Sequence, residues 1–264
     1  MKKALILIAL LILALSVVAC GNDGEAVIIT SPSDLEAPGI RIGVQLGTTG
    51  HVFATDNLGE AEVVPYDTNS DAILALLSGD VDAVIMDNLP ALEFVSQNEG
   101  RLYQLDEMLT HEAYGISLPL GSPYTALFNE AIDTLRANGT LDAIINYWAT
   151  DYPNLTRYET PAGTEHPNGT LLMGTNADFP PFEFIEYGEI VGIDPDLARA
   201  IGDILGYQIE IVDMDFAGII LAVQTGQVDF GMAGMTITEE RLEQVDFTQG
   251  YFLSGQSIII RIAD

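Results

Sequence analysis

The chain has little that could carry covalent catalysis or form a disulfide. Its 264 residues include one cysteine, Cys20, and three histidines, His51, His111 and His166, which do not have the spacing of a metal site. No nucleophile elbow, P-loop or dinucleotide-binding glycine motif occurs. Acidic residues are so numerous that counting cannot select a catalytic pair among them. The sequence therefore predicts a protein that is not an enzyme and that holds no metal or cofactor.

Positive charge is also scarce. The chain has 39 Asp and Glu against 9 Lys and Arg, which gives a formal net charge of −30, and both lysines stand at positions 2 and 3. A nucleic-acid-binding protein neutralises phosphates with a basic face, which this composition excludes. Charge-based attachment to anionic lipid is disfavoured for the same reason. Since arginine is so rare here, an arginine beside a binding motif is a candidate ligand contact.

The first twenty residues have the composition of a secretion signal. Two lysines precede an apolar run at 4–15, and small residues lead to Cys20. A cysteine in this place is typical of bacterial lipoproteins, in which the thiol takes a lipid and becomes the new N-terminus. A transmembrane anchor is the alternative, although the run is short for a span. We expect a lipoprotein signal at 1–20, a tether at 21–27, and an extracytoplasmic protein anchored to a membrane through Cys20.

Strand and helix patterns alternate beyond the tether. Strand patterns lie at 40–47, 81–87, 228–234 and 255–262. Helical patterns lie at 70–79, 122–139, 140–148, 191–206 and 217–226, with Ser70 or Asp71, Ser122 and Asp194 as expected N-caps. Residues 151–170 contain three prolines and two glycines, which is the composition of a linker. The alternation favours an α/β architecture with mostly parallel sheets.

One stretch of the sequence recurs. Residues 74–87 and 221–234 align without a gap at an offset of 147, and Leu, Ala, Gly, Val and Asp match in place. Helix–glycine–strand units look alike in many α/β proteins, which is one explanation. The other is a pair of similar lobes that face each other across a crevice, where ligands bind in open α/β sheets.

A few side chains have the chemistry to hold a zwitterion. The turn at 47–50, GTTG, offers N–H groups and hydroxyls to an anion. Arg241 can grip a carboxylate, unless it is a solvated residue paired with a neighbouring glutamate. Asp87 can hold an ammonium, unless it caps the next helix. Phe179 and Phe216 can enclose an apolar stem, unless they belong to the core. A carboxylate on one side and an ammonium on the other describe an α-amino acid.

Several stretches carry a resemblance to a known family. They are GVQLGTTG, VDAVIMDNLP, AYGISLPLGS, GTNADFPPFEF, GIDPDLARAIGDILG, FAGIILAVQTGQVDF and AGMTITEERLEQVDFT. Together they resemble the polar amino-acid solute-binding proteins of bacterial ABC importers (family 3) over roughly 31–148 and 171–262. The resemblance implies a periplasmic-binding-protein-like type II fold, in which two α/β lobes joined by a two-segment hinge close over one ligand. Such a protein delivers the ligand to an ABC permease and its ATPase.

The two resembling blocks stand in exchanged order. In the family, the block like 171–262 comes first and the block like 31–148 follows it, so the resemblance implies a circular permutant. Termini that lie at the surface tolerate such a change. We therefore expect one continuous lobe at 117–252, which contains the linker, and one discontinuous lobe made of 28–116 and 253–264.

The resemblance also implies the ligand contacts, position by position. Contacts to the α-carboxylate are implied for Arg241, Thr236, Thr48 and Thr49. Contacts to the α-ammonium are implied for Asp87, the Gly234 carbonyl and the Thr236 hydroxyl. Phe179 and Phe216 flank the ligand side chain, and Asn176 and Gln45 fall where the family tunes specificity. Because both of these last two are uncharged, a neutral polar amino acid such as glutamine is favoured.

Three other hypotheses stay open. One is an enzyme on the same scaffold, because cyclohexadienyl or prephenate-type dehydratases resemble this fold. Another is a sensory module that signals ligand binding to a partner. The last is a truncated tandem fusion whose halves complete each other by domain swapping, against which we expect a monomer.

Overall fold

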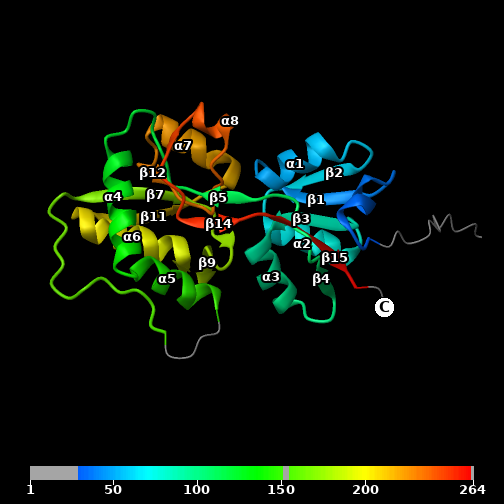
Figure 1. Cartoon of the computed structure of the whole chain (residues 1–264), viewed down its shortest axis with the longest axis horizontal. Coiled ribbons are helices and arrows are strands. Elements are labelled where there is room, and N and C mark those ends of the chain that lie inside the picture. The colour runs from blue at the N-terminus through cyan, green and yellow to red at the C-terminus, as the bar shows by residue number, and fades with distance from the viewer. Residues whose placement is uncertain (1–28, 151–154, 263–264) are drawn as a thin grey trace, which may run out of the picture.

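The computed structural model describes residues 29–150 and 155–262, which form two α/β lobes side by side (Figure 1). The expected signal at 1–20, with Cys20, and the tether at 21–27 lie outside the described residues. Within the described part, no helix is both long enough and apolar enough to cross a membrane. The same residues contain no group of His, Cys, Asp and Glu side chains arranged to hold a metal ion.

One lobe, here the β1 lobe, is built on a five-stranded sheet in the order β2-β1-β3-β15-β4. Its strands are β1 (Arg41–Gln45), β2 (Glu62–Tyr66), β3 (Ala83–Asp87), β4 (Leu102–Gln104) and β15 (Gln256–Arg261). Its helices are η1 (Pro32–Glu36), α1 (Thr49–Asn57), α2 (Asn69–Ser78) and α3 (Asn88–Gln97). Strands β1, β2 and β3 run parallel, whereas β15 is antiparallel to both of its neighbours.

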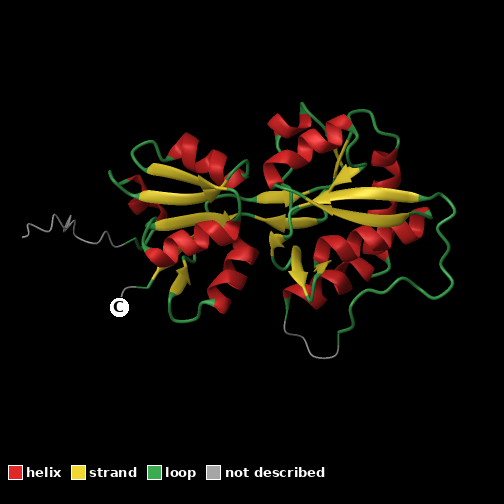
Figure 2. Cartoon of the chain, turned by 180° about the vertical axis from the view of Figure 1, so that it is seen from behind, coloured by secondary structure: helices red, strands yellow, loops and turns green. Residues whose placement is uncertain are grey.

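The strand β3 shows why this sheet is covered on both faces. All five of its residues are buried. Ala83 and Ile85 pack in the cluster that contains residues of α1, and Val84 and Met86 pack in the cluster that contains residues of α2 and α3. Because side chains alternate between the faces of a strand, a continuous apolar run needs helices on both sides. Figure 2 shows this arrangement in each lobe.

The other lobe, here the β7 lobe, has a second five-stranded sheet in the order β11-β7-β12-β6-β13. Its strands are β6 (Ser117–Leu118), β7 (Thr170–Thr175), β11 (Gln208–Asp213), β12 (Phe230–Gly231) and β13 (Asp246–Phe247). A small sheet contains β8 (Asp178–Phe179), β9 (Glu183–Glu186) and β10 (Glu189–Val191). The helices are α4 (Tyr124–Ala137), α5 (Thr140–Ala149), α6 (Ile193–Leu205), η2 (Phe216–Gly218), α7 (Ile219–Thr225) and α8 (Glu239–Leu242).

The two lobes are linked by a short antiparallel pair of strands. These are β5 (Glu112–Tyr114) and β14 (Phe252–Ser254), which lie between the lobes in Figure 1. Tyr114 ends β5, pairs with the first residue of β14, is fully buried, and makes ring contacts with Phe179, Phe182, Tyr251 and Phe252. The crossing is therefore packed into the core of the β7 lobe as well as paired through its backbone.

Of the three expected helix caps, one is confirmed and two are wrong. Helix α2 begins one residue before Ser70, and the hydroxyl of Thr68, rather than Ser70 or Asp71, accepts from the backbone N–H of Asp71. Ser122 does cap α4: Pro123 has helical backbone angles, and the Ser122 hydroxyl accepts from the N–H of Tyr124. Asp194 lies inside the first turn of α6, and its carboxylate is turned to another part of the lobe. Each polar run offers several capping side chains, and the backbone path decides among them.

Residues 155–169 contain no helix or strand and lie against α6. Arg157 donates through Nε and Nη2 to the fully buried carboxylate of Asp196, at 3.1 and 2.9 Å, and lies over the ring of Trp148. Tyr158 and His166 both reach Asp203. One of the chain's few arginines therefore fastens this segment to the lobe.

Candidate functional site

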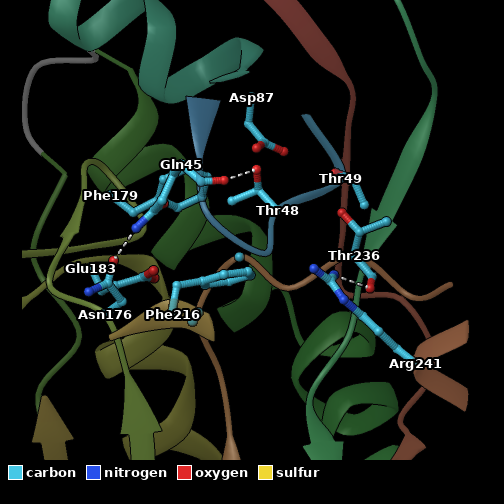
Figure 3. A pocket seen from close by; sticks show the side chains of 12 residues that line it. Gln45, Thr48, Thr49, Asp87, Asn176, Phe179, Glu183, Phe216, Thr236 and Arg241 are labelled. Carbon is cyan, nitrogen blue, oxygen red and sulfur yellow. Dashed lines mark hydrogen bonds between the residues drawn. The ribbon is translucent and has the colours of Figure 1, made fainter. Parts of the chain in front are cut away.

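A cavity lies where the two lobes face each other (Figure 3). The space between its walls, open solvent included, is about 300 Å³, and it is lined by Gln45, Thr48, Thr49, Asp87, Asn176, Phe179, Glu183, Phe216, Ala233, Gly234, Thr236 and Arg241. All ten residues expected as ligand contacts are among them. They come from segments nearly 200 residues apart in sequence. Glu183 and Ala233 are the two lining residues that the sequence analysis did not select.

The strand ends explain why these residues meet. Gln45 is the last residue of β1, Asp87 is the last residue of β3, and Asn176 follows β7 directly. The carboxyl ends of parallel strands in an open α/β sheet share one edge, and here the edges of both lobes face the cavity. Loops that leave those ends then supply the remaining contacts.

The Gly/Thr turn leads into a helix N-terminus. The hydroxyl of Thr48 accepts from the N–H of His51 and donates to the carbonyl of Gln45, so it serves the helix cap. The N–H groups in the first turn of α1, beginning with Thr49, have no acceptor within the helix. A helix N-terminus of this kind attracts anions. The turn can therefore hold a carboxylate through its backbone rather than through the Thr48 hydroxyl.

Arg241 is the only cationic residue that lines the cavity within the described residues. Its side chain is buried, lies 5.5 Å from the ring centre of Phe216, and donates to the carbonyls of Thr236 (2.7 Å) and Gly47 (3.0 Å). Burial lowers the pKa of its guanidinium, while Asp87 and Glu112 act in the opposite direction. None of the ion pairs in the described part of the chain involves Arg241. The pairing with a neighbouring glutamate is therefore absent, and the buried cation lacks an anion.

Asp87 is a buried carboxyl that forms no ion pair with a cationic side chain in the described part of the chain. It occupies the position before α3 but makes no side-chain cap bond, so it is not held there by the helix. The Tyr114 hydroxyl donates to it. Burial, and then repulsion from Glu112, raise the pKa of Asp87 to about 7. An ammonium group beside Asp87 would reverse that shift, because an opposite charge favours the ionised form.

Glu112 accepts hydrogen bonds from three threonine hydroxyl groups at or beside the cavity. It accepts from Thr49 (2.8 Å), Thr236 (2.5 Å) and Thr110 (2.6 Å). A hydroxyl has one proton, so Thr49 and Thr236 can offer the cavity only lone pairs while they donate to Glu112. They are then suited to accept from an ammonium rather than to donate to a carboxylate. Glu112 belongs to no motif, and the sequence carries no signal that would have selected it.

The two expected specificity residues bond to each other across the lobes. Gln45 Nε2 donates to Asn176 Oδ1 at 2.9 Å, and Asn69 Nδ2 donates to Gln45 Oε1 at 2.8 Å. Asn176 Nδ2 donates to the carbonyl of Met214. Each side-chain amide thus has protein partners at both its oxygen and its nitrogen.

Glu183 stands out among the buried groups. Its side chain is 0% exposed, and apart from the carboxyl of Asp194 neither of its oxygens has a hydrogen-bond partner. Burial, followed by the nearby charge of Asp194, holds the pKa of Glu183 well above its usual range. Asp194 itself accepts from the Gly234 N–H and from the Tyr251 hydroxyl, and burial raises its pKa to about 6. Asp194 therefore positions the Gly234 turn, whereas Glu183 is left facing the cavity.

These features define a class of protein. Two α/β lobes, two chain crossings and a cavity lined from both sides are the periplasmic-binding-protein-like architecture, as the resemblance implies. Residues 171–264 match the model of the bacterial extracellular solute-binding proteins, family 3, a family whose description names the binding of solutes.

Individual relatives match over shorter stretches. The arginine-binding extracellular protein ArtP of Bacillus subtilis is 45% identical over 98 residues, which are 37% of this chain and 38% of ArtP. The arginine-binding protein ArgT of Corynebacterium glutamicum is 40% identical over 33% of this chain and 29% of its own length. A glutamine-binding protein of Geobacillus stearothermophilus is 34% identical over 39% and 43%. The chain thus spans less than half the length of each of these relatives.

The chain also resembles the solved structure of an ancestral arginine-binding protein bound to arginine. The two are 56% identical over 32% of this chain and 38% of the ancestral protein, with a TM-score of 0.32.

Proposed function

We propose that the protein captures an α-amino acid outside the cytoplasm and delivers it to an ABC importer without chemical change. One observation carries the proposal: a buried arginine without an anion and a buried aspartate without a cation line the same cavity. Figure 3 shows Asp87 and Arg241 on different sides of that cavity. In the zwitterion of an α-amino acid, the carboxylate and the ammonium are attached to the same carbon. Such a ligand supplies an anion for Arg241 and a cation for Asp87.

The contacts suggest how the ligand lies. Its carboxylate lies against the Arg241 guanidinium and the free N–H groups of the first turn of α1, where a bidentate bond replaces the Arg241 contact to Gly47. Its ammonium lies against Asp87, the Gly234 carbonyl and the Thr236 hydroxyl oxygen. Phe179 and Phe216 hold the apolar part of the side chain. The ammonium restores the ionised form of Asp87, so charge is balanced inside the closed cavity.

Lobe closure couples binding to recognition by the importer. The cavity walls belong to both lobes, and the lobes also meet through Gln45–Asn176 (2.9 Å), Arg241–Gly47 (3.0 Å) and Ser70–Asp178 (2.8 Å from the Ser70 N–H). A ligand that touches both lobes shifts the population towards the closed form. The closed form is then what the permease recognises, and its ATPase drives the transport.

The chain organisation follows the same proposal. We infer a circular permutant with a continuous lobe at 117–252 and a discontinuous one made of 28–116 and 253–264. The exchanged order of the two family-like blocks supports it, as does β15, which joins the sheet of the β1 lobe from the far end of the chain. A lipid on Cys20 would hold this monomer at the outer side of a membrane.

The choice of glutamine rested on two neutral residues, Asn176 and Gln45. In the structure these amides are bonded to each other and to the surrounding protein. They are therefore less available to a ligand amide than the sequence suggested. The relatives named above include both arginine- and glutamine-binding proteins.

The test begins with a thermal-shift panel of the twenty amino acids, because a tight ligand stabilises the folded state by mass action. Calorimetry then compares the wild type with Arg241→Ala and with the exposed control Arg101→Ala. We expect Arg241→Ala to weaken binding of the selected amino acid by at least about 100-fold, since a buried charged partner is lost. Unchanged affinity in Arg241→Ala, or turnover of a prephenate-like acid, would overturn the proposal.

A further inference from the structure

The charges that line the cavity do not match a simple zwitterion. Among the twelve lining residues, all within the described part of the chain, the ionisable side chains are two acids, Asp87 and Glu183, and one base, Arg241. An α-carboxylate pairs with Arg241 and an α-ammonium pairs with Asp87. Glu183 then remains without a cation to pair with. The complement of two acids and one base is a molecule with one carboxylate and two cationic groups.

Glu183 has no cationic partner within the described residues. Both of its oxygens are buried, and neither accepts a hydrogen bond from an N–H group or a hydroxyl. Its one hydrogen-bond partner is the carboxyl of Asp194, a second acid, which also accepts from the Gly234 N–H and the Tyr251 hydroxyl. Arg241, the one cation on the cavity wall within the described residues, donates to Thr236 and Gly47 instead. A cation for Glu183 must therefore come from outside the described part of the chain.

Glu183 lies where a ligand side chain would end. Figure 3 shows it beside Asn176 and next to the ring of Phe216, away from Arg241. A chain of methylene groups that starts near Arg241 and passes along Phe216 therefore leads towards Glu183. The amides of Gln45 and Asn176 flank this end, but they are already bonded to each other.

We propose that Glu183 is the specificity-determining residue of the cavity and that it selects an amino acid whose side chain ends in a cation, foremost a guanidinium. The inference rests on the proposed function and names the substrate class of the same site. The two oxygens of one carboxylate match the two parallel N–H donors of a guanidinium, whereas an ammonium is a single point charge. Arginine is therefore expected to bind more tightly than lysine or ornithine.

The experiment compares arginine with citrulline, because citrulline has the same length and a neutral urea in place of the guanidinium. Affinities of arginine, citrulline and glutamine are measured by calorimetry for the wild type, for Glu183→Gln, and for Glu186→Gln. Glu186 is the control because it is the exposed glutamate of the same strand, β9. Circular dichroism and thermal unfolding report whether each variant is folded.

We expect the wild type and Glu186→Gln to bind arginine at least about 30-fold more tightly than citrulline, and Glu183→Gln to reduce that ratio to within about threefold. A wild type that binds citrulline or glutamine as tightly as arginine overturns the proposal, and this result does not depend on the folding of any variant. A Glu183→Gln variant that is folded and keeps the full ratio also overturns it. If no amino acid binds the wild type at all, the proposed function itself has failed, so the two failures are distinguishable.

Discussion

Replacing Asp87 with asparagine should weaken ligand binding and yet stabilise the ligand-free protein. The pKa of Asp87 is about 7 in the folded protein, against a model-peptide value of 3.8, and burial is the main cause. Between these two values the unfolded chain releases the proton first, so stability falls as the pH rises from about 4 to about 8. At about 1.4 kcal/mol per pH unit, the difference between 3.8 and about 7 amounts to about 4 kcal/mol above pH 8.

Asparagine has nearly the same shape and does not ionise. Its carbonyl oxygen can still accept from the Tyr114 hydroxyl, which donates to Asp87 in the wild type. We therefore expect Asp87→Asn to unfold in urea with a free energy up to about 4 kcal/mol higher than the wild type at pH 8, and nearly equal at pH 4. Ligand is first removed by unfolding and refolding in both proteins.

The control for general charge effects is Asp106→Asn, which removes an exposed carboxylate from the same lobe. Because the whole chain is strongly acidic, both proteins become more stable as the pH falls, and only the difference between variant and wild type reports on Asp87. An equal stability difference at pH 4 and pH 8 would refute the reasoning. So would a ligand affinity in Asp87→Asn that matches the wild type, because the carboxylate would then not hold the ammonium.

Two further changes test contacts outside the cavity. Asp178→Ala removes the two hydrogen bonds across the lobes that the Ser70 N–H (2.8 Å) and the Ser70 hydroxyl donate to Asp178. This change should weaken ligand affinity about three- to tenfold in calorimetry, with little change in the free energy of unfolding. An unchanged affinity would show that this contact does not favour the closed form. Arg157→Ala removes one cationic partner of the buried Asp196 carboxylate. This change should lower the free energy of unfolding in urea by about 2 kcal/mol, while ligand affinity stays the same. Equal stability would mean that the Arg157–Asp196 pair does not hold residues 155–169 against the lobe.

Much of the fold can be predicted from local pattern. The glycines at 79, 206 and 226 end their helices in the left-handed conformation that favours glycine, and the sequence signal for each is short and unambiguous. The apolar run at 171–173 alternates between the two faces of its sheet, with Leu171 and Met173 on one side and Leu172 on the other. These signals depend only on neighbours in the chain, so a single sequence contains them.

The cavity was predictable as a set of residues but not as a network. Family-like motifs selected both Asp87, which ends β3 at the crevice, and Arg241, which lies in α8 beyond the end of β12. The role of Glu183 could not be seen, since a glutamate in a short strand between aromatic residues is exposed more often than buried. Nothing in the sequence states that Gln45 and Asn176, 131 residues apart, bond across the lobes. Such contacts depend on the relative placement of two separate sheets, for which local pattern has no signal.

The position of β15 has a consequence for the order of events during synthesis. This strand lies between β3 and β4 in the sheet of the β1 lobe, although it is formed by residues 256–261. All strands of the main β7 sheet lie between residues 117 and 247. The residues of the β1 lobe leave the ribosome first. The edges of β3 and β4 that pair with β15 therefore stay unpaired until the β7 lobe has been synthesised. A nascent chain stalled before residue 256 should expose those edges to chaperones, while its β7 sheet is already complete.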